Sequence, residues 1–201
     1  MQQVNKTILI VFLTSLFIVA QKNNGEQVVS KSDEFRHSIN MCPLGIAFGV
    51  YSANYEYMIT KTHGIVFRLD YEDIPDTYSD AKINVNGKAV VLNYRYHCDE
   101  KLGSFYLGAY GRYRIYEGDG NLNSQKFDFD IKDFTVGLNA GKKWVWDSGF
   151  NINFTLGYGY TFRDKTQSLS STEINKSIKV FEDDYAFIDA FLGEFSIGYA
   201  F

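Results

Sequence analysis

Nine charged residues lie in segments in which every second residue is apolar. The positions between the apolar residues hold these charges together with glycine, asparagine and threonine. Both signs of charge occur among them. If such side chains share a narrow interior they must pair, because an isolated buried ion costs several kcal/mol of desolvation. We therefore expect an interior network of ion pairs formed by Glu56, Arg68, Asp70, Glu72, Arg95, Arg112, Arg114, Lys143 and Glu194.

Metal, cofactor and disulfide chemistry have little support in the sequence. Cys42 and Cys98 are the two cysteines of the chain, which is too few for a disulfide scaffold or a zinc site with paired C-x-x-C ligands. We expect two free thiols, because the proposed strands hold these residues too far apart for a bridge. No metal or cofactor is expected.

A period of two residues governs the chain from residue 36 onward. From Phe150 to Phe162 every even position is apolar or aromatic, while Asn, Thr and Gly occupy the odd positions, and this is the pattern of a β-strand. The first segment is the least regular, because it contains Pro43. The same pattern predicts eight strands, at about 36–48, 50–60, 64–74, 88–98, 104–116, 132–146, 149–163 and 191–201.

Composition agrees with an all-β protein that is exported. The 201 residues include 17 Phe and 15 Tyr but two Pro, which makes a helical bundle improbable, and the net charge of −4 leaves no basic surplus for nucleic acid. Residues 1–20 combine Lys6 with a short apolar run, which is typical of a signal peptide. Residues 21–35 are then a periplasmic N-terminal segment, and 36–201 form one domain.

The connections between the expected strands alternate in length. Those at 61–63, 99–103 and 147–148 are short, whereas those at about 73–87, 117–131 and 164–184 are long, polar and acidic. Bacterial outer-membrane barrels have short periplasmic turns and longer extracellular loops. The chain is therefore predicted to be an eight-stranded antiparallel up-and-down transmembrane β-barrel in the bacterial outer membrane.

A soluble barrel or sandwich would show the same alternation, so the composition of the polar face has to decide. That face mixes arginines with many glycines. Glycine weakens a solvated strand, but a lumen just wide enough for side chains must interleave large and small residues. The glycines favour a polar interior and a lipid-facing aromatic exterior, with an interfacial girdle that includes Tyr71, Tyr116, Trp144, Trp146 and Tyr160.

The last segment, FLGEFSIGYAF, resembles the C-terminal signal by which outer-membrane barrels are recognised for insertion, through Phe195, Ile197, Tyr199 and Phe201. Together with the signal peptide, it makes the chain similar to small eight-stranded outer-membrane proteins of the OmpA-barrel and OmpX type, especially uncharacterised ones of Bacteroidetes. The resemblance implies a monomer without a cofactor, inserted by the barrel assembly machinery.

The expected function is structural or surface-interacting, with a plugged polar lumen. His37, His63 and His97 fall near the periplasmic end, and no Ser/His/Asp arrangement is legible, so we expect no enzymatic activity. Two alternatives stay open, a small gated pore and an enzyme that modifies lipid A in the outer leaflet. The expected partners are the bilayer, lipopolysaccharide and an extracellular protein or glycan that binds the loops at about 118–130 and 165–184.

Overall fold

The fold was analysed in a computed structural model, which describes residues 30–74, 83–122, 125–168 and 171–201. The signal peptide predicted at 1–20, and all but the end of the segment predicted at 21–35, lie outside the described residues. Side chains of several residues late in the long helix are likewise outside the description.

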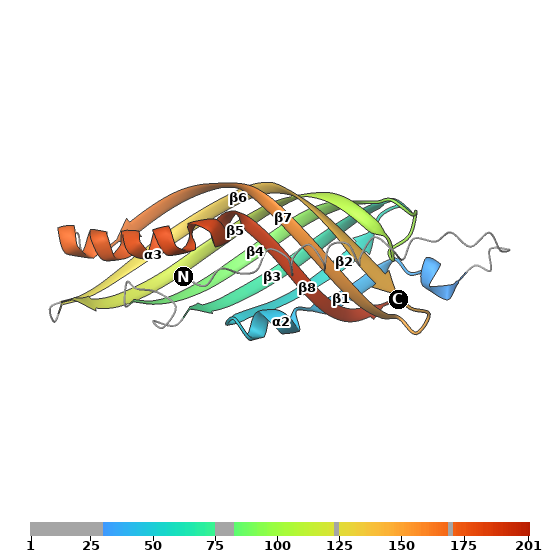
Figure 1. The fold of residues 1–201 in the computed structure, drawn as a ribbon, viewed down its shortest axis with the longest axis horizontal. Helices are drawn as coiled ribbons and strands as arrows, with labels where there is room; N and C mark the ends of the chain where they lie inside the picture. Colours follow the sequence, from blue (N-terminus) through green and yellow to red (C-terminus); the bar gives the residue numbers. More distant parts are fainter. Residues whose placement is uncertain (1–29, 75–82, 123–124, 169–170) are drawn as a thin grey trace, which may run out of the picture.

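Eight antiparallel strands form a closed barrel in which each strand pairs with its neighbours in sequence, and β1 closes the barrel on β8 (Figure 1). The predicted fold class is confirmed. The strands are β1 (His37–Met41), β2 (Val50–Met58), β3 (His63–Ile74), β4 (Asn84–His97), β5 (Phe105–Leu122), β6 (Gln125–Val145), β7 (Phe150–Gln167) and β8 (Phe191–Ala200).

Within the described parts of the chain, three helices accompany the barrel: η1 (Lys31–Asp33), α2 (Pro43–Ile46) and α3 (Thr172–Ala190). The helix α3 lies at one end of the barrel, whereas α2 lies beside the wall near β1 and β8 (Figure 1). Among the described residues, no helix combines the length and the apolar character needed to span a bilayer.

The first strand is shorter than predicted. The segment at 36–48 was expected to be one strand, but β1 ends at Met41 and Pro43 opens α2. Proline lacks the N–H that a ladder needs and suits the first turn of a helix. Gly49 then returns the chain to β2 with a φ of 74°, a conformation that costs glycine little.

The prediction of long polar loops at 117–131 and 164–184 is also wrong. Strands β5 and β6 continue through the first region and pair as far as Leu122 with Gln125, and the second region contains the end of β7 and most of α3. The loop predicted at 73–87 is shorter, because β3 reaches Ile74 and β4 begins at Asn84. These elements form an ordered extension of the barrel.

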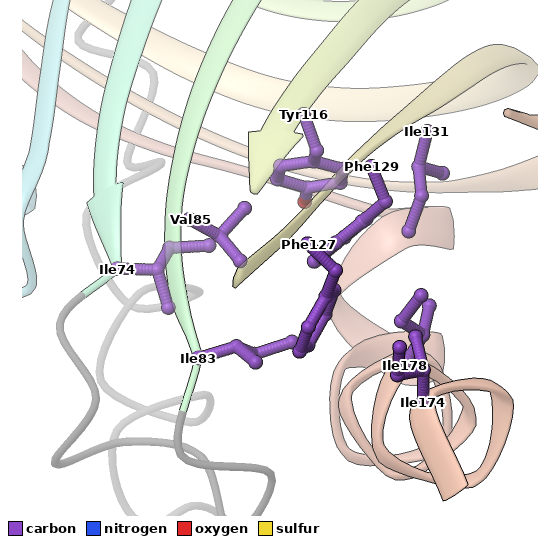
Figure 2. Packing of buried hydrophobic residues seen from close by; sticks show 9 residues of the cluster. All are labelled: Ile74, Ile83, Val85, Tyr116, Phe127, Phe129, Ile131, Ile174 and Ile178. Atoms are coloured by element: carbon purple, nitrogen blue, oxygen red, sulfur yellow. The ribbon is translucent and has the colours of Figure 1, made fainter. Parts of the chain in front are cut away.

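An apolar cluster inside the barrel explains why this extension is ordered. On β6, Phe127, Phe129 and Ile131 are buried, while Asp128 and Asp130 between them are exposed. Figure 2 shows how α3 contributes to the same cluster. The cluster consists of Ile74, Ile83, Val85, Tyr116, Phe127, Phe129, Ile131, Ile174 and Ile178.

Further along β6 the apolar residues change sides. Phe134 and Leu138 are 47% and 71% exposed on the outer surface, while Asp133 and Thr135 are buried inside. The apolar side chains of β6 therefore lie inside the barrel up to Ile131 and on its outer surface from Phe134 onward. This change between Ile131 and Phe134 marks the border between the extension and the rest of the wall.

The opposite end, which carries the short turns, is closed by a second apolar cluster. Met58, Leu102 and Ala200 are buried there, with Phe35 and Val145 packed against them. The segment before β1 is held to the turns: Lys101 Nζ lies 2.9 Å from Asp33 Oδ1, and the Ser32 backbone N–H donates to Asp147 Oδ1 over 2.9 Å. Hydrogen bonds from Ser30 and Ser32 lower the pKa of Asp147.

Candidate functional site in the barrel interior

A layer of polar side chains crosses the lumen between the two apolar clusters. All nine residues of the predicted charge network are buried inside the barrel, none more than 8% exposed. Five of them belong to this layer, where neutral polar residues and His97 link them. We call the connected set the plug layer; its members, one or more from each of the eight strands, are Ser38, Glu56, Arg68, Arg95, His97, Tyr106, Lys143, Asn153 and Glu194.

Glu56 is the centre of the plug layer. One oxygen, Oε2, lies 2.9 Å from Arg95 Nη1 and 2.6 Å from Lys143 Nζ, while Oε1 lies 3.0 Å from His97 Nε2. Glu56, Lys143 and His97 are each 0% exposed. A carboxylate in this position attracts two buried cations and so offsets the unfavourable free energy of their desolvation.

Contacts of Glu194 extend the plug layer to the remaining strands. Its Oε2 lies 3.3 Å from Arg95 Nη2 and 3.9 Å from Arg68 Nη1, and its Oε1 accepts from Asn153 Nδ2 over 2.7 Å. Tyr106 donates to Asn153 Oδ1 over 2.8 Å, and its ring centroid lies 4.3 Å from Arg95 Cζ. Each wall of the barrel is therefore joined to the opposite wall by charged or polar side chains.

Small residues make room for the large ones in this layer. A Cβ added at Gly141 would collide with the Tyr106 ring, and one at Gly108 would lie 2.6 Å from Asn139 Oδ1. At these two positions the interior is too crowded for any side chain larger than that of glycine, as predicted for a narrow lumen.

The four other residues of the predicted network lie between the plug layer and the apolar extension. Arg68 also contacts Asp70, with Nε 2.6 Å from Oδ1, and Arg114 Nε lies 3.3 Å from Glu72 Oε1. Arg112 donates to the Phe191 carbonyl over 3.1 Å. One ion pair in this region was missed from the sequence: Arg163 Nη2 lies 2.7 Å from the buried Asp133 Oδ2.

A serine, a histidine and a glutamate also meet in the interior, which the sequence did not reveal. His97 Nδ1 lies 2.9 Å from Ser104 Oγ, and the other ring nitrogen faces Glu56. All three residues are 0% exposed. A nucleophilic serine needs a substrate carbonyl within reach, and burial of this hydroxyl leaves no space for one. In this arrangement His97 acts as a polar link of the plug layer.

The predicted aromatic girdle is partly displaced. Tyr71, Trp146 and Tyr160 are 43%, 46% and 67% exposed on the outer surface, and Trp144 is half-buried. Tyr116 was predicted incorrectly: it is 1% exposed and belongs to the interior apolar cluster. It follows Arg112 and Arg114 at intervals of two, so the pleat of β5 directs all three side chains inward.

Further aromatic side chains surround the end with the short turns. His37 Nδ1 lies 2.7 Å from the Tyr55 hydroxyl, and His63 Nδ1 lies 2.6 Å from the Tyr94 hydroxyl. Exposed aromatic rings with polar tips suit a boundary between hydrocarbon and water. The other aromatic members of this belt are Tyr57, Tyr96, Trp146, Phe150 and Phe201, each at least 40% exposed.

The C-terminal residues form part of the closing seam. Phe195, Tyr199 and Phe201 are exposed on the outer surface, and Ile197 is half-buried opposite Met41. The Phe201 carbonyl accepts from the His37 backbone N–H over 3.0 Å. Their role as an insertion signal stays a prediction.

The two cysteines are free, as predicted. Cys42 lies between β1 and α2 and is buried, whereas Cys98 follows β4 and is exposed. Cys98 lies at the end with the short turns, whereas Cys42 lies farther along the wall at the start of α2, and no bridge joins them.

Comparison with known proteins gives a family and two distant structures. The family described as "Protein of unknown function (DUF3575)" matches residues 7–192. A search of curated proteins found no match. The structure of Acinetobacter baumannii CarO2 is similar with a TM-score of 0.41 and 10% identity, over 83% of this chain and 98% of that chain. For Acinetobacter baumannii CarO, the TM-score is 0.42 and the identity 12%, over 88% and 99%.

Proposed function

The chain belongs to the DUF3575 family, whose function is unknown, and we propose from its own structure that it is a plugged outer-membrane β-barrel acting at the cell surface. The observation that carries the proposal is the combination of an apolar outer wall with an interior layer of buried ion pairs. In water this arrangement would expose its most apolar residues and bury its charges, which is unfavourable. In a bilayer the apolar residues contact hydrocarbon, and the paired charges inside the barrel are kept away from it.

The outer surface supports the membrane location. Along β6 the exposed residues of the wall include Phe134, Val136 and Leu138, and the neighbouring strands continue the apolar surface with Leu107 and Tyr158. A contiguous exposed surface of this kind is unusual for a soluble monomer. The apolar band and the aromatic belt together match the exterior of an outer-membrane barrel.

The interior supports a closed barrel rather than a pore. The plug layer joins all eight strands through buried side chains, and the cluster of Met58, Leu102 and Ala200 lies below it. Eight-stranded barrels have an interior that side chains can fill completely. Among the described residues, catalytic groups with access to a substrate are not apparent, so a non-enzymatic role is part of the proposal.

The ordered extension supports a role at the cell surface. Its outer face carries exposed acidic residues, including Glu117, Asp119, Asp128 and Asp130, while its interior is apolar. An acidic surface of this kind suits contact with an extracellular protein or glycan, or with lipopolysaccharide through shared divalent cations. Monomeric insertion by the barrel assembly machinery, and the likeness to OmpA-barrel and OmpX proteins, belong to the same proposal.

Conductance across planar bilayers tests the closed lumen. The folded wild-type protein is expected to give no resolvable channels, because the plug layer leaves no continuous water path. The double variant Glu56→Ala with Arg95→Ala removes one buried ion pair without changing the net charge, and it is also expected to give no resolvable channels, because the apolar clusters on both sides of the plug layer still close the lumen. Steady channels from the wild type would contradict the proposal and favour the gated pore.

A further inference from the structure

One charged residue interrupts the apolar outer wall of the barrel. Lys142 lies on β6 at an even interval from Leu138 and Trp146, so the pleat of the strand directs its side chain outward with theirs. An ionisable side chain is unfavourable next to hydrocarbon, and its presence in such a surface points to a partner. The outward positions around it on β5, β6 and β7 are uncharged, and they include Phe105, Leu107, Ala140, Trp144, Phe154 and Leu156.

Aromatic side chains position the ammonium group of Lys142 at the edge of the wall. The register partners of Lys142 are Phe105 on β5 and Phe154 on β7, and Nζ lies 4.4 Å from the centroid of the Phe105 ring. Phe105 is the first residue of β5 and follows the short turn from β4. The stem of the half-buried lysine therefore lies against apolar surface, while its charge lies near the short turns.

The protein supplies no dedicated counterion for this ammonium group. Among the described residues, none forms an ion pair with Lys142. Two charged residues of the neighbouring turn, Asp99 and Lys101, act on it electrostatically with opposite signs, and Lys101 Nζ itself lies 2.9 Å from Asp33 Oδ1. The site therefore leaves one cation that an external anionic group can compensate.

The aromatic belt indicates which anionic group lies within reach. Trp146 and Phe150 belong to this belt, with ring centroids 5.3 Å apart, and Trp146 follows Lys142 by four residues on the same face. In the proposed membrane location, such a belt lies at the level where hydrocarbon gives way to headgroups. An extended lysine side chain at this depth reaches the phosphates of the adjacent leaflet.

We infer that Lys142 binds the phosphate of a phospholipid headgroup in the leaflet beside the short turns. The phosphate contacts the ammonium group at the edge of the wall, and the acyl chains lie along the apolar surface formed by Leu107, Ala140 and Leu156. The inference rests on the proposed membrane location, because the bilayer supplies the lipid. Charge-assisted hydrogen bonds between an ammonium group and phosphate oxygens hold the headgroup.

Quenching of tryptophan fluorescence by brominated lipid tests the site, because the two tryptophans of the chain, Trp144 and Trp146, lie beside Lys142 on the outward face. The folded protein is placed in bilayers of neutral digalactosyl diacylglycerol that contain a minor fraction of phosphatidylcholine brominated in its acyl chains close to the headgroup. The phospholipid is expected to quench as if it were at least about threefold enriched beside the tryptophans. Inorganic phosphate, which has no acyl chain, is expected to leave this enrichment unchanged.

Variants assign the enrichment to one side chain. Lys142→Gln removes the charge from an outward position of the wall, and it is expected to reduce quenching to the value set by the bilayer composition. Lys142→Arg keeps the charge and is expected to keep the enrichment. The matched control is Lys132→Gln, which removes an exposed lysine from the same face of β6 at the other end of the wall and is expected to quench like the wild type.

Enrichment that persists in Lys142→Gln, that is lost equally in Lys132→Gln, or that inorganic phosphate abolishes would overturn the inference. A gel shift between unheated and boiled samples shows that each variant is folded. The same measurement separates the site from the membrane location. Quenching of the wild type in proportion to bilayer composition contradicts the phosphate site alone, whereas no quenching at any composition contradicts the lipid-facing wall.

Discussion

Replacing Glu56 with glutamine is expected to lower the free energy of unfolding by about 3 to 5 kcal/mol. The substitution keeps the shape of the side chain but leaves Arg95 and Lys143 without the carboxylate that compensates them, and both are at most 1% exposed. Urea unfolding of the protein in phosphatidylcholine vesicles, followed by tryptophan fluorescence, measures the change.

A second substitution separates lost charge compensation from general damage to the interior. Among Glu56, Glu194, Arg95 and Lys143 the charges balance, and Glu56→Gln leaves one excess cation. Adding Lys143→Met restores the balance with an apolar side chain of similar length, so the double variant is expected to recover much of the lost stability. A double variant that is less stable than the single one would contradict this account.

The control is Glu117→Gln on the outer surface. Glu117 Oε2 lies 2.7 Å from Lys88 Nζ, but both side chains are more than half exposed. Pairs of this kind contribute at most about 1 kcal/mol, so the control is expected to unfold almost like the wild type.

The second large effect is expected on the outer wall. Leu138→Arg places a guanidinium at a position that is 71% exposed, with Ala109 and Tyr158 as its register partners. If this surface contacts the middle of the bilayer, the substitution costs about 2 to 4 kcal/mol. In a water-soluble barrel the same change on an exposed position would be nearly neutral.

Asp130→Arg is the matched control on the same strand and the same face. Asp130 is exposed on the ordered extension, beyond the point at which the apolar residues change sides. An arginine there contacts water and is expected to change stability by less than about 1 kcal/mol. Equal effects of the two substitutions in vesicle unfolding experiments would show that Leu138 does not contact hydrocarbon.

The parts of the fold that follow from the alternation of residues were predictable. The pleat of a strand fixes which side chains share a face, so the inward position of Arg95 and Lys143 follows from the sequence once their strands are recognised. Their contacts with Glu56 do not follow, because β2, β4 and β6 approach one another across the lumen only when the barrel closes. The contact of His97 with Glu56 could not be predicted from the sequence for the same reason.

The ordered extension was mistaken for loops because its charges dominate the composition. Yet Phe127, Phe129 and Ile131 recur at intervals of two between Lys126, Asp128 and Asp130, which is the pattern of a strand with its apolar side inward. The signal was present, but it has the opposite phase to the part of β6 that we propose faces lipid. In the proposed location, water surrounds the extension and hydrocarbon surrounds the wall, which reverses the side on which apolar residues are favourable.

Spin labels on β6 test most directly whether the outer wall of the barrel contacts lipid. With Cys42 and Cys98 replaced by alanine, single cysteines at Asp128, Asp130, Val136 and Leu138 place labels on the same outward face. In vesicles, labels at 136 and 138 are expected to collide mainly with oxygen, and those at 128 and 130 mainly with a water-soluble nickel chelate. Equal access of the nickel chelate to all four positions would contradict the claim.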